Sequence, residues 1–193
     1  MTCYEDLVRI IDRLKSRNKR IIVAIDGPCA SGKTTLSKVL SKHFFADVLH
    51  MDDYFLPPNL RTPERYSTPG GNVHYERFLE EVLIPISESR PYVYRPFHCK
   101  TMSFGDATES EPALITIVEG SYSLHPALAS YYDLKVFLSI ESSEQTERLL
   151  RRNGEEKTKE FISKWIPLEN LYISGLNIKE SADMVVELKG ELL

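Results

Sequence analysis

The feature that most constrains this chain is a glycine-containing loop placed between a buried strand and a helix. The run Arg20–Asp26 is rich in β-branched residues and predicts a strand buried on both faces. Helical spacing of apolar residues resumes over Thr34–His43. Between them, Gly27-Pro-Cys-Ala-Ser-Gly-Lys-Thr34 matches G-x-x-x-x-G-K-[ST] at every fixed position. The alternative is that the motif matches by chance in an ordinary turn, but the strand before it and the helix after it disfavour that interpretation. The motif and its context therefore predict a phosphate-binding loop.

The residue types in this loop suit a polyphosphate. Glycines let successive backbone N–H groups turn toward one centre, and the helix N-terminus adds partial positive charge. Lys33 supplies a point charge for the β- and γ-phosphates, and the Thr34 hydroxyl is placed to bind Mg²⁺. Cys29 has no histidine nearby in sequence, so we interpret it as a small filler and not a nucleophile. The residues expected to hold the phosphates are Gly27, Pro28, Cys29, Ala30, Ser31, Gly32, Lys33, Thr34 and Thr35.

Further strands alternate with helical stretches along the chain. Helices are predicted over 4–17, 75–87, from 142 through the arginines to 152, and over 161–173. Strands are predicted over 47–51, 113–118, 134–140 and 183–187, and a short helix is expected to open at His125-Pro126. Ser142-Ser-Glu-Gln145 has the spacing of a capping box, and a polar break is expected over 153–159. Alternation of this kind predicts a parallel sheet with helices on both faces, with ligands at the carboxyl ends of the strands.

Three stretches are predicted to cover the ligands. Residues 57–73 carry too many prolines for a regular element, and a loop of this length is usually functional or disordered. Residues 91–104 are expected to be extended, as a small hairpin or flap. We interpret both as a substrate-side lid, and residues 148–160 as a lid on the nucleotide side.

Acidic residues at strand ends are the candidate catalytic groups. Asp52 and Asp53 directly follow a predicted strand, where one carboxylate could accept a proton from an attacking hydroxyl and another could help to hold Mg²⁺. Glu119 ends another apolar strand and is a candidate to orient Mg²⁺. Arg148 and Arg152 could neutralise charge on a transferred phosphoryl group. The alternatives are solvated turn acids and a solvated helix face.

Composition excludes several classes of protein. Lys plus Arg number 24 and Asp plus Glu number 28, a formal charge of −4, which disfavours a general nucleic-acid binder. The three cysteines are few and widely spaced, which disfavours a disulfide framework and fits a reducing compartment. No run approaches the roughly 18–20 apolar residues of a membrane span, and no secretory signal is evident, so we expect a cytoplasmic protein without a membrane partner. The N-K-x-D pattern of guanine-specific GTPases is missing after the loop.

Six segments carry a resemblance to a known family: Gly27–Thr35, His50-Met-Asp-Asp-Tyr-Phe-Leu-Pro57, Pro69–Phe78, Tyr94-Arg-Pro-Phe97, Val118-Glu-Gly-Ser-Tyr122 and Trp165-Ile-Pro-Leu-Glu169. Together they resemble the uridine kinase family of P-loop small-molecule kinases. Related families include nicotinamide riboside kinase, pantothenate kinase and phosphoribulokinase. The resemblance implies an α/β P-loop NTPase fold in a single domain over 1–193, with a parallel sheet, helices on both faces and a small lid or flap region.

The resemblance implies ATP and Mg²⁺ as cofactors and a nucleoside-like acceptor. Asp52 matches the carboxylate that takes the proton of the sugar 5′-hydroxyl, and Thr34, Asp52 and Glu119 lie where the metal is held. Lys33, Arg148 and Arg152 join Asp52 as the expected catalytic set. The residues expected near the substrate are Asp53, Tyr54, Phe55, His74, Arg95, His98 and Tyr122.

Two departures concern the acceptor. His74 and His98 stand where family members often carry aspartates near the ribose and near the base, and each could hydrogen-bond a hydroxyl with a different charge. Uridine or cytidine is the first guess for the acceptor. The alternatives are another small alcohol, such as nicotinamide riboside or pantothenate, and a non-catalytic nucleotide-binding regulator. The sequence does not determine whether the chain forms a homo-oligomer.

Overall fold

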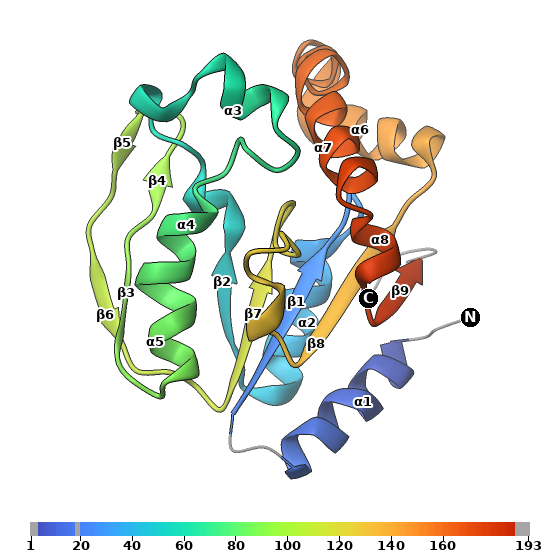
Figure 1. Ribbon diagram of the computed structural model, residues 1–193. Helices are drawn as coiled ribbons and strands as arrows, with labels where there is room; N and C mark the ends of the chain where they lie inside the picture. Colours follow the sequence, from blue (N-terminus) through green and yellow to red (C-terminus); the bar gives the residue numbers. More distant parts are fainter. Residues whose placement is uncertain (1–3, 18–19, 188–193) are drawn as a thin grey trace.

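A parallel sheet of five strands forms the centre of the molecule. The computed structural model describes residues 4–17 and 20–187. The strands run in the order β2-β7-β1-β8-β9, and all four neighbouring pairs are parallel. Their bounds are β1 Ile21–Asp26, β2 Asp47–His50, β7 Ile115–Glu119, β8 Leu134–Ser139 and β9 Met184–Glu187. The α/β fold with a parallel sheet and helices around it is therefore confirmed (Figure 1).

Alternate residues of β1 point into two separate cores. Ile21, Val23 and Ile25 pack with Leu7 and Leu36 in one core, which belong to α1 (Tyr4–Arg17) and α2 (Lys33–Phe44). The residues between them in β1 pack into the other core, which takes side chains from α4 (Tyr75–Phe78), α5 (Ile84–Ser87), α7 (Ile166–Gly175) and α8 (Ile178–Ser181). Since side chains alternate along a strand, an entirely apolar strand needs cover on both faces.

The predicted helix over 75–87 forms with a wide turn in its middle. The π-helical turn η3 (Leu79–Leu83) joins α4 to α5, and a second π-helical turn, η5 (Phe161–Trp165), precedes α7. Pro85 and Pro167 stand at the second residue of the α-helix that follows each turn. Proline has no N–H to donate and its ring crowds the preceding turn, so a locally wider helix is a recognised accommodation.

Two local expectations were wrong, and a third was met at one residue. The N-cap of α6 (Ser142–Glu160) is Glu141 and not Ser142, no side-chain capping bond forms, and the Gln145 amide donates to a distant carbonyl oxygen. No helix opens at His125-Pro126; turns lead to a 3₁₀ turn, η4 (Ala129–Tyr131). The break expected over 153–159 is confined to Gly154, where φ is 75°, ψ is 173° and the helix kinks, and the residues around it are helical.

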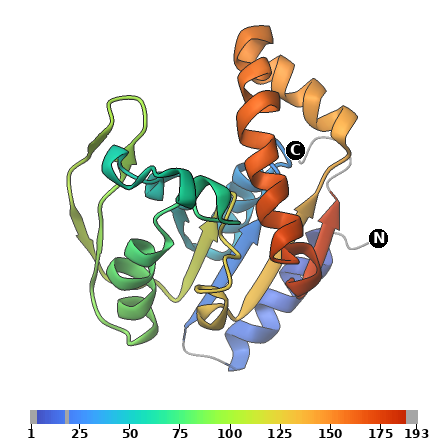
Figure 2. The same ribbon diagram turned by 45° about the horizontal axis from the view of Figure 1, so that its top comes forward.

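The segment 57–73 lies beyond the carboxyl ends of the strands, and the antiparallel ribbons after residue 91 run along one side of the molecule (Figure 1). Residues 57–73 contain only short helical turns, η2 (Pro58–Leu60) and α3 (Pro63–Ser67), and η1 (Met51–Tyr54) precedes them. The stretch after residue 91 forms two antiparallel ribbons: β3 (Tyr92–Tyr94) pairs with β6 (Thr108–Ser110), and β4 (Phe97–His98) pairs with β5 (Ser103–Phe104). Figure 2 shows these ribbons and the α6–α7 arm on opposite sides of the molecule.

Within residues 4–17 and 20–187, no helix combines the length and the apolar character that crossing a bilayer would need.

Candidate active site

The glycine-containing loop joins β1 to α2, as the motif predicts. Gly27 has φ of 144°, and a Cβ there would lie 2.3 Å from the carbonyl oxygen of Leu138 in β8. Gly32, at the start of α2, has φ of 102°. Only glycine tolerates both the positive φ and the close approach of a neighbouring strand. The loop therefore presents its backbone at the N-terminus of a 12-residue helix, which is a favourable place for an anion.

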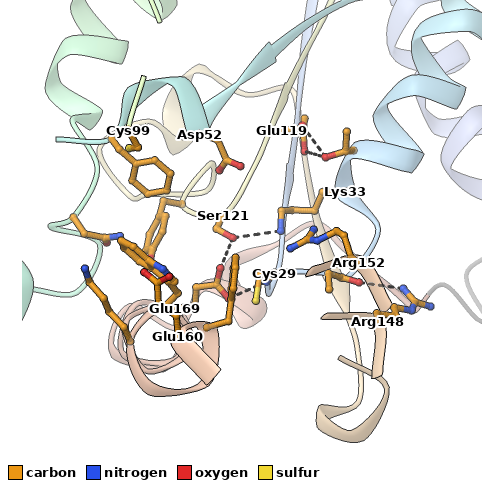
Figure 3. Close-up of a pocket in the computed structure, with 18 of the residues that line it drawn as sticks. Cys29, Lys33, Asp52, Cys99, Glu119, Ser121, Arg148, Arg152, Glu160 and Glu169 are labelled. Atoms are coloured by element: carbon orange, nitrogen blue, oxygen red, sulfur yellow. Dashed lines mark hydrogen bonds between the residues drawn. The ribbon is translucent and has the colours of Figure 1, made fainter. Parts of the chain in front are cut away.

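Lys33 lies across this loop. Its Nζ donates hydrogen bonds to the carbonyl oxygens of Gly27 and Pro28, each at 2.9 Å, and to Ser121 Oγ at 3.3 Å. The side chain is buried, with 9% of its surface exposed. The ammonium group is therefore held over the centre of the loop by oxygen acceptors that a phosphate could replace (Figure 3).

The buried carboxylate of Asp26 holds the start of the loop in place through hydrogen bonds. Asp26 accepts hydrogen bonds from the backbone N–H groups of Gly27, Tyr122 and Leu124 and from the hydroxyl of Tyr172, at 2.6, 3.2, 2.8 and 2.7 Å. Burial raises the pKa of Asp26 from 3.8 to about 6, although the donors from Leu124, Tyr172 and Gly27 oppose the rise. Asp26 thus connects the loop to the turn after β7 and to α7.

Thr34 and Glu119 form a pair of oxygen ligands beside the loop. Thr34 Oγ1 lies 3.2 Å from Glu119 Oε1, and His50 Nδ1 lies 2.6 Å from the same oxygen. This contact raises the pKa of His50, since the carboxylate favours the imidazolium. Among the described residues no cluster of three or more His, Cys, Asp or Glu could enclose a metal ion. A hydroxyl and a carboxylate nevertheless fit Mg²⁺, which takes few protein ligands together with phosphate oxygens and water.

The two neighbouring aspartates have different surroundings. Asp52 lines the cavity beside the loop, where restricted hydration raises the pKa of its carboxyl group while the charge of Lys33 opposes the rise. Asp53 turns away and accepts a hydrogen bond from the Tyr94 hydroxyl at 2.5 Å. The structure therefore distinguishes two residues that the sequence left equivalent: only Asp52 can reach a ligand in this cavity.

Helix α6 brings two arginines and a glutamine to the loop. Arg148 donates to the carbonyl oxygen of Ala30 at 3.2 Å and pairs with Glu144 at 2.6 Å. The Gln145 amide donates to the carbonyl oxygen of Cys29 at 3.0 Å. Arg152 also lines the cavity, on the same side as Lys33 (Figure 3). Of the residues expected on a nucleotide-side lid, Arg148 therefore contacts the loop directly.

Glu169 is a site residue to which the sequence assigned no role. It is buried in α7, and its two oxygens accept hydrogen bonds from the Cys29 N–H and the Ser121 hydroxyl, each at 2.8 Å. Burial, reinforced by the charge of Glu169, raises the pKa of the Cys29 thiol to about 12. A thiol with so high a pKa is a poor nucleophile. Glu169 lies in the matching segment Trp165–Glu169, which was the only sequence signal for it.

One cavity of about 720 Å³ brings most of the predicted residues together. This volume is typical of small-molecule sites. The predicted residues that line it are Cys29, Ala30, Gly32, Lys33, Thr34, Thr35, Asp52, Phe55, Glu119, Tyr122, Arg148 and Arg152. Lining residues without an assigned role are Arg61, Asn72, Cys99, Lys100, Met102, Ser121, Glu160, Phe161, Lys164, Trp165 and Glu169.

Several residues expected near the substrate lie outside this lining. Tyr54 is fully buried, with its ring 4.8 Å from that of Phe78. Arg95 stacks on Phe104 in the ribbon β4–β5, at 4.4 Å from the ring centroid. His74 precedes α4 and His98 lies in β4, and neither contributes to the cavity wall. Gly27, Pro28, Ser31 and Asp53 are the other predicted residues outside the lining.

Comparison with known proteins supports this fold. No protein-family model matches the chain. It is 24% identical over 192 residues to a uridine kinase of Bacillus mycoides (strain KBAB4), covering 90% of this chain and 88% of that protein. A solved structure of a possible uridine kinase from Bacillus stearothermophilus has a TM-score of 0.67 at 19% identity, with 93% and 98% of the two chains covered. A protein proposed to be a fructose transport system kinase, from Silicibacter sp. TM1040, has a TM-score of 0.72 at 22% identity, with 96% and 99% covered.

The sheet order, the loop at the end of β1 and the pair Thr34–Glu119 define a P-loop NTPase fold with the layout of a small kinase. Within this class, the chain is related to the uridine kinase family of P-loop kinases, over nearly its whole length. The relatives that match the chain over this length are described as kinases.

Proposed function

We propose that this protein is an ATP-dependent kinase that transfers the γ-phosphoryl group to a primary hydroxyl of a nucleoside-like small molecule, with uridine and cytidine the first acceptors to test. One observation carries the proposal. A phosphate-binding loop with its lysine, and a carboxylate with a raised pKa, line the same cavity of about 720 Å³. Proximity of the phosphate site and a candidate base is what phosphoryl transfer to an alcohol requires.

The residues of the loop would hold the triphosphate. Lys33 Nζ would exchange the carbonyl oxygens of Gly27 and Pro28 for phosphate oxygens. Thr34 and Glu119, with Asp52 near them, would hold Mg²⁺, which neutralises phosphate charge when bound. Arg148 and Arg152 would approach the transferred group from α6.

Asp52 is assigned the role of base. Its carboxylate would accept the proton of the acceptor hydroxyl as the oxygen bonds to the γ-phosphorus and the bond to the β-phosphate oxygen breaks, which releases ADP. A raised pKa makes Asp52 a stronger base than an ordinary carboxylate. The side chains from α6 and η5 close one wall of the cavity, and exclusion of water there would limit hydrolysis of ATP.

The test is an assay of nucleoside diphosphate release, of ADP from ATP or of GDP from GTP, with a panel of alcohols as acceptors. The panel contains uridine, cytidine, nicotinamide riboside and pantothenate. With the accepted alcohol, Asp52→Asn should reduce kcat by a factor on the order of 10²–10⁴, as expected for loss of a general base. Asp53→Asn is the matched control and should lose far less, because that carboxylate is turned toward Tyr94.

Two results would contradict the proposal. Near-full activity of Asp52→Asn would remove Asp52 from the reaction. Tight binding of ATP without transfer to any alcohol in the panel would support a non-catalytic nucleotide-binding regulator instead.

A further inference from the structure

The positive charges around the cavity divide into two groups. Lys33, Arg148 and Arg152 lie on the side of the phosphate-binding loop, and the proposed function accounts for them (Figure 3). Three more cations, Arg61, Lys100 and Lys164, also line the cavity but have no role in binding ATP in that proposal. We call these three residues the second cationic group.

The second cationic group lies on the acceptor side. Arg61 Nη2 is 3.6 Å from Cys99 Sγ, and Lys100 is the next residue along the chain. In Figure 3, Cys99 is on the far side of Asp52 from Lys33. Lys164 comes from the opposite wall, beside Trp165. Three separate segments therefore bring positive charge to the region where the acceptor would extend beyond Asp52.

These cations have no carboxylate partners among residues 4–17 and 20–187. The Arg61 Nε–H donates to the Leu56 carbonyl oxygen at 2.7 Å, which orients the guanidinium without neutralising it. Lys164 Nζ lies 4.4 Å from the Trp165 ring centroid. No ion pair joins Arg61, Lys100 or Lys164 to a described acidic residue. Unpaired cations that converge on one cavity form a site for an anion, particularly in a chain with a net charge of −4.

Apolar side chains accompany this charge. Phe55 and Trp165 meet across the cavity with ring centroids 6.3 Å apart, and Met102 lines the same cavity with 47% of its surface exposed. Glu160 is the only carboxylate in the lining that neither contacts the loop region nor follows β2. The acceptor side therefore combines an aromatic and thioether surface with three cations and one opposing charge.

We propose that the acceptor is an anionic alcohol, which carries a carboxylate or a phosphate away from the reacting hydroxyl and has an unsaturated or apolar body. This inference rests on the proposed kinase function. The second cationic group would bind the remote anion while Asp52 meets the hydroxyl. A cationic acceptor such as nicotinamide riboside would be disfavoured by the same charges.

Matched acceptors with one reacting hydroxyl test the inference. Uridine, orotidine and uridine 3′-monophosphate share the 5′-hydroxyl but are neutral, carboxylated and phosphorylated, so the last two separate the two sources of negative charge. Pantothenate and its neutral methyl ester repeat the comparison with a body that is not a nucleoside. We expect at least one anion to exceed its neutral counterpart about tenfold in kcat/KM, the effect of one charge-assisted contact in a partly exposed site.

Reversal of one charge tests whether the second cationic group causes the preference for an anionic acceptor. Lys100→Glu should reduce this preference about tenfold. Lys42→Glu is the matched control, since Lys42 is an exposed residue of α2 outside the cavity lining, and it should leave the preference intact. Dissociation constants of the same compounds, measured by calorimetry with Mg²⁺ and a non-hydrolysable ATP analogue, give a second readout that needs no turnover.

The outcomes separate the two claims. Transfer to neutral and anionic partners alike, or a preference that Lys100→Glu leaves unchanged, would overturn the anionic acceptor while the kinase function stands. Tighter binding of the anions without phosphoryl transfer would support the anion site and overturn the kinase function. Equal binding of neutral and anionic partners would overturn the anion site whatever the turnover.

Discussion

Removal of the Tyr172 hydroxyl isolates the anchor beneath the phosphate-binding loop. This hydroxyl donates to Asp26 Oδ2 at 2.7 Å, and both groups are almost completely buried. Tyr172→Phe keeps the ring, which packs 4.7 Å from that of Tyr122, so the substitution changes little besides this one hydrogen bond. The variant therefore measures how strongly α7 stabilises the carboxylate that holds the loop.

The expected magnitude follows from the charge of Asp26. The net rise in its pKa from 3.8 to about 6 corresponds to about 3 kcal/mol of unfavourable burial of the charged form, which remains although donors such as the Tyr172 hydroxyl oppose the rise. A hydrogen bond to a charged group contributes about 1.5–3 kcal/mol, and Tyr172→Phe removes one such bond. We expect Tyr172→Phe to lower the free energy of unfolding by about 2 kcal/mol at pH 8.

The pH dependence has a defined sign. Between pH about 4 and 6, folded Asp26 binds more protons than unfolded Asp26, so its contribution to the free energy of unfolding falls as the pH rises. At pH 5 the group is mostly protonated, and the lost hydrogen bond is one between neutral groups, worth about 1 kcal/mol. The effect of Tyr172→Phe should therefore be about twofold larger at pH 8 than at pH 5.

Urea unfolding at the two pH values measures both quantities. Tyr132→Phe is the control, because Tyr132 is also buried but its hydroxyl has no hydrogen-bond partner among the described residues. Loss of that hydroxyl should leave the free energy of unfolding unchanged or raise it by up to about 1 kcal/mol. The reasoning is refuted if the two variants destabilise equally, or if the cost of Tyr172→Phe is the same at both pH values.

Two further pairs of variants test the loop and α6. Gly27→Ala should abolish ADP binding, measured by calorimetry, and should destabilise the fold by more than Gly154→Ala, measured by urea unfolding. The added Cβ at Gly27 would overlap the Leu138 carbonyl, whereas a Cβ at Gly154 meets no atom within 4 Å. If only backbone strain mattered, both variants would lower the free energy of unfolding equally, by about 1–3 kcal/mol. Gln145→Ala should lower the free energy of unfolding by about 1–2 kcal/mol, because it removes a buried hydrogen bond to the loop. Ser142→Ala should lower it by less than about 0.5 kcal/mol, because Ser142 makes no capping bond. The opposite order in thermal unfolding would indicate that Ser142 and Gln145 form a capping box after all.

Elements with a strong periodic signal could be predicted from the sequence. The apolar runs that became β1, β7 and β8 and the spacing that became α1 and α2 are local patterns, which tertiary contacts reinforce. The predicted break at residues 153–159 is confined to a kink at Gly154, and the residues around that glycine are helical. The partner strand of β3 was not predicted because β6, at Thr108–Ser110, is short and carries no alternation of apolar residues.

The candidate site divides in the same way. Gly27, Lys33 and Thr34 could be identified because their functions depend on fixed spacing along the chain, and Asp52 and Glu119 because each follows a recognisable strand. Glu169, by contrast, lies 140 residues from Cys29, whose N–H it binds. A contact over such a separation depends on how α7 packs against the sheet, and no local pattern encodes it.

By itself, the sequence determined the parallel α/β fold, the phosphate-binding loop and the strand ends that carry the acidic residues. Hydrophobic periodicity and glycine geometry are local constraints, so they can be read from neighbouring residues. Only the tertiary structure decided that Asp52 faces the cavity while Asp53 bonds to Tyr94, and that Arg61, Lys100 and Lys164 from separate segments line the same cavity. Side-chain direction and the summed charge of a cavity depend on packing between distant segments, and these properties determine which molecules the site can accept.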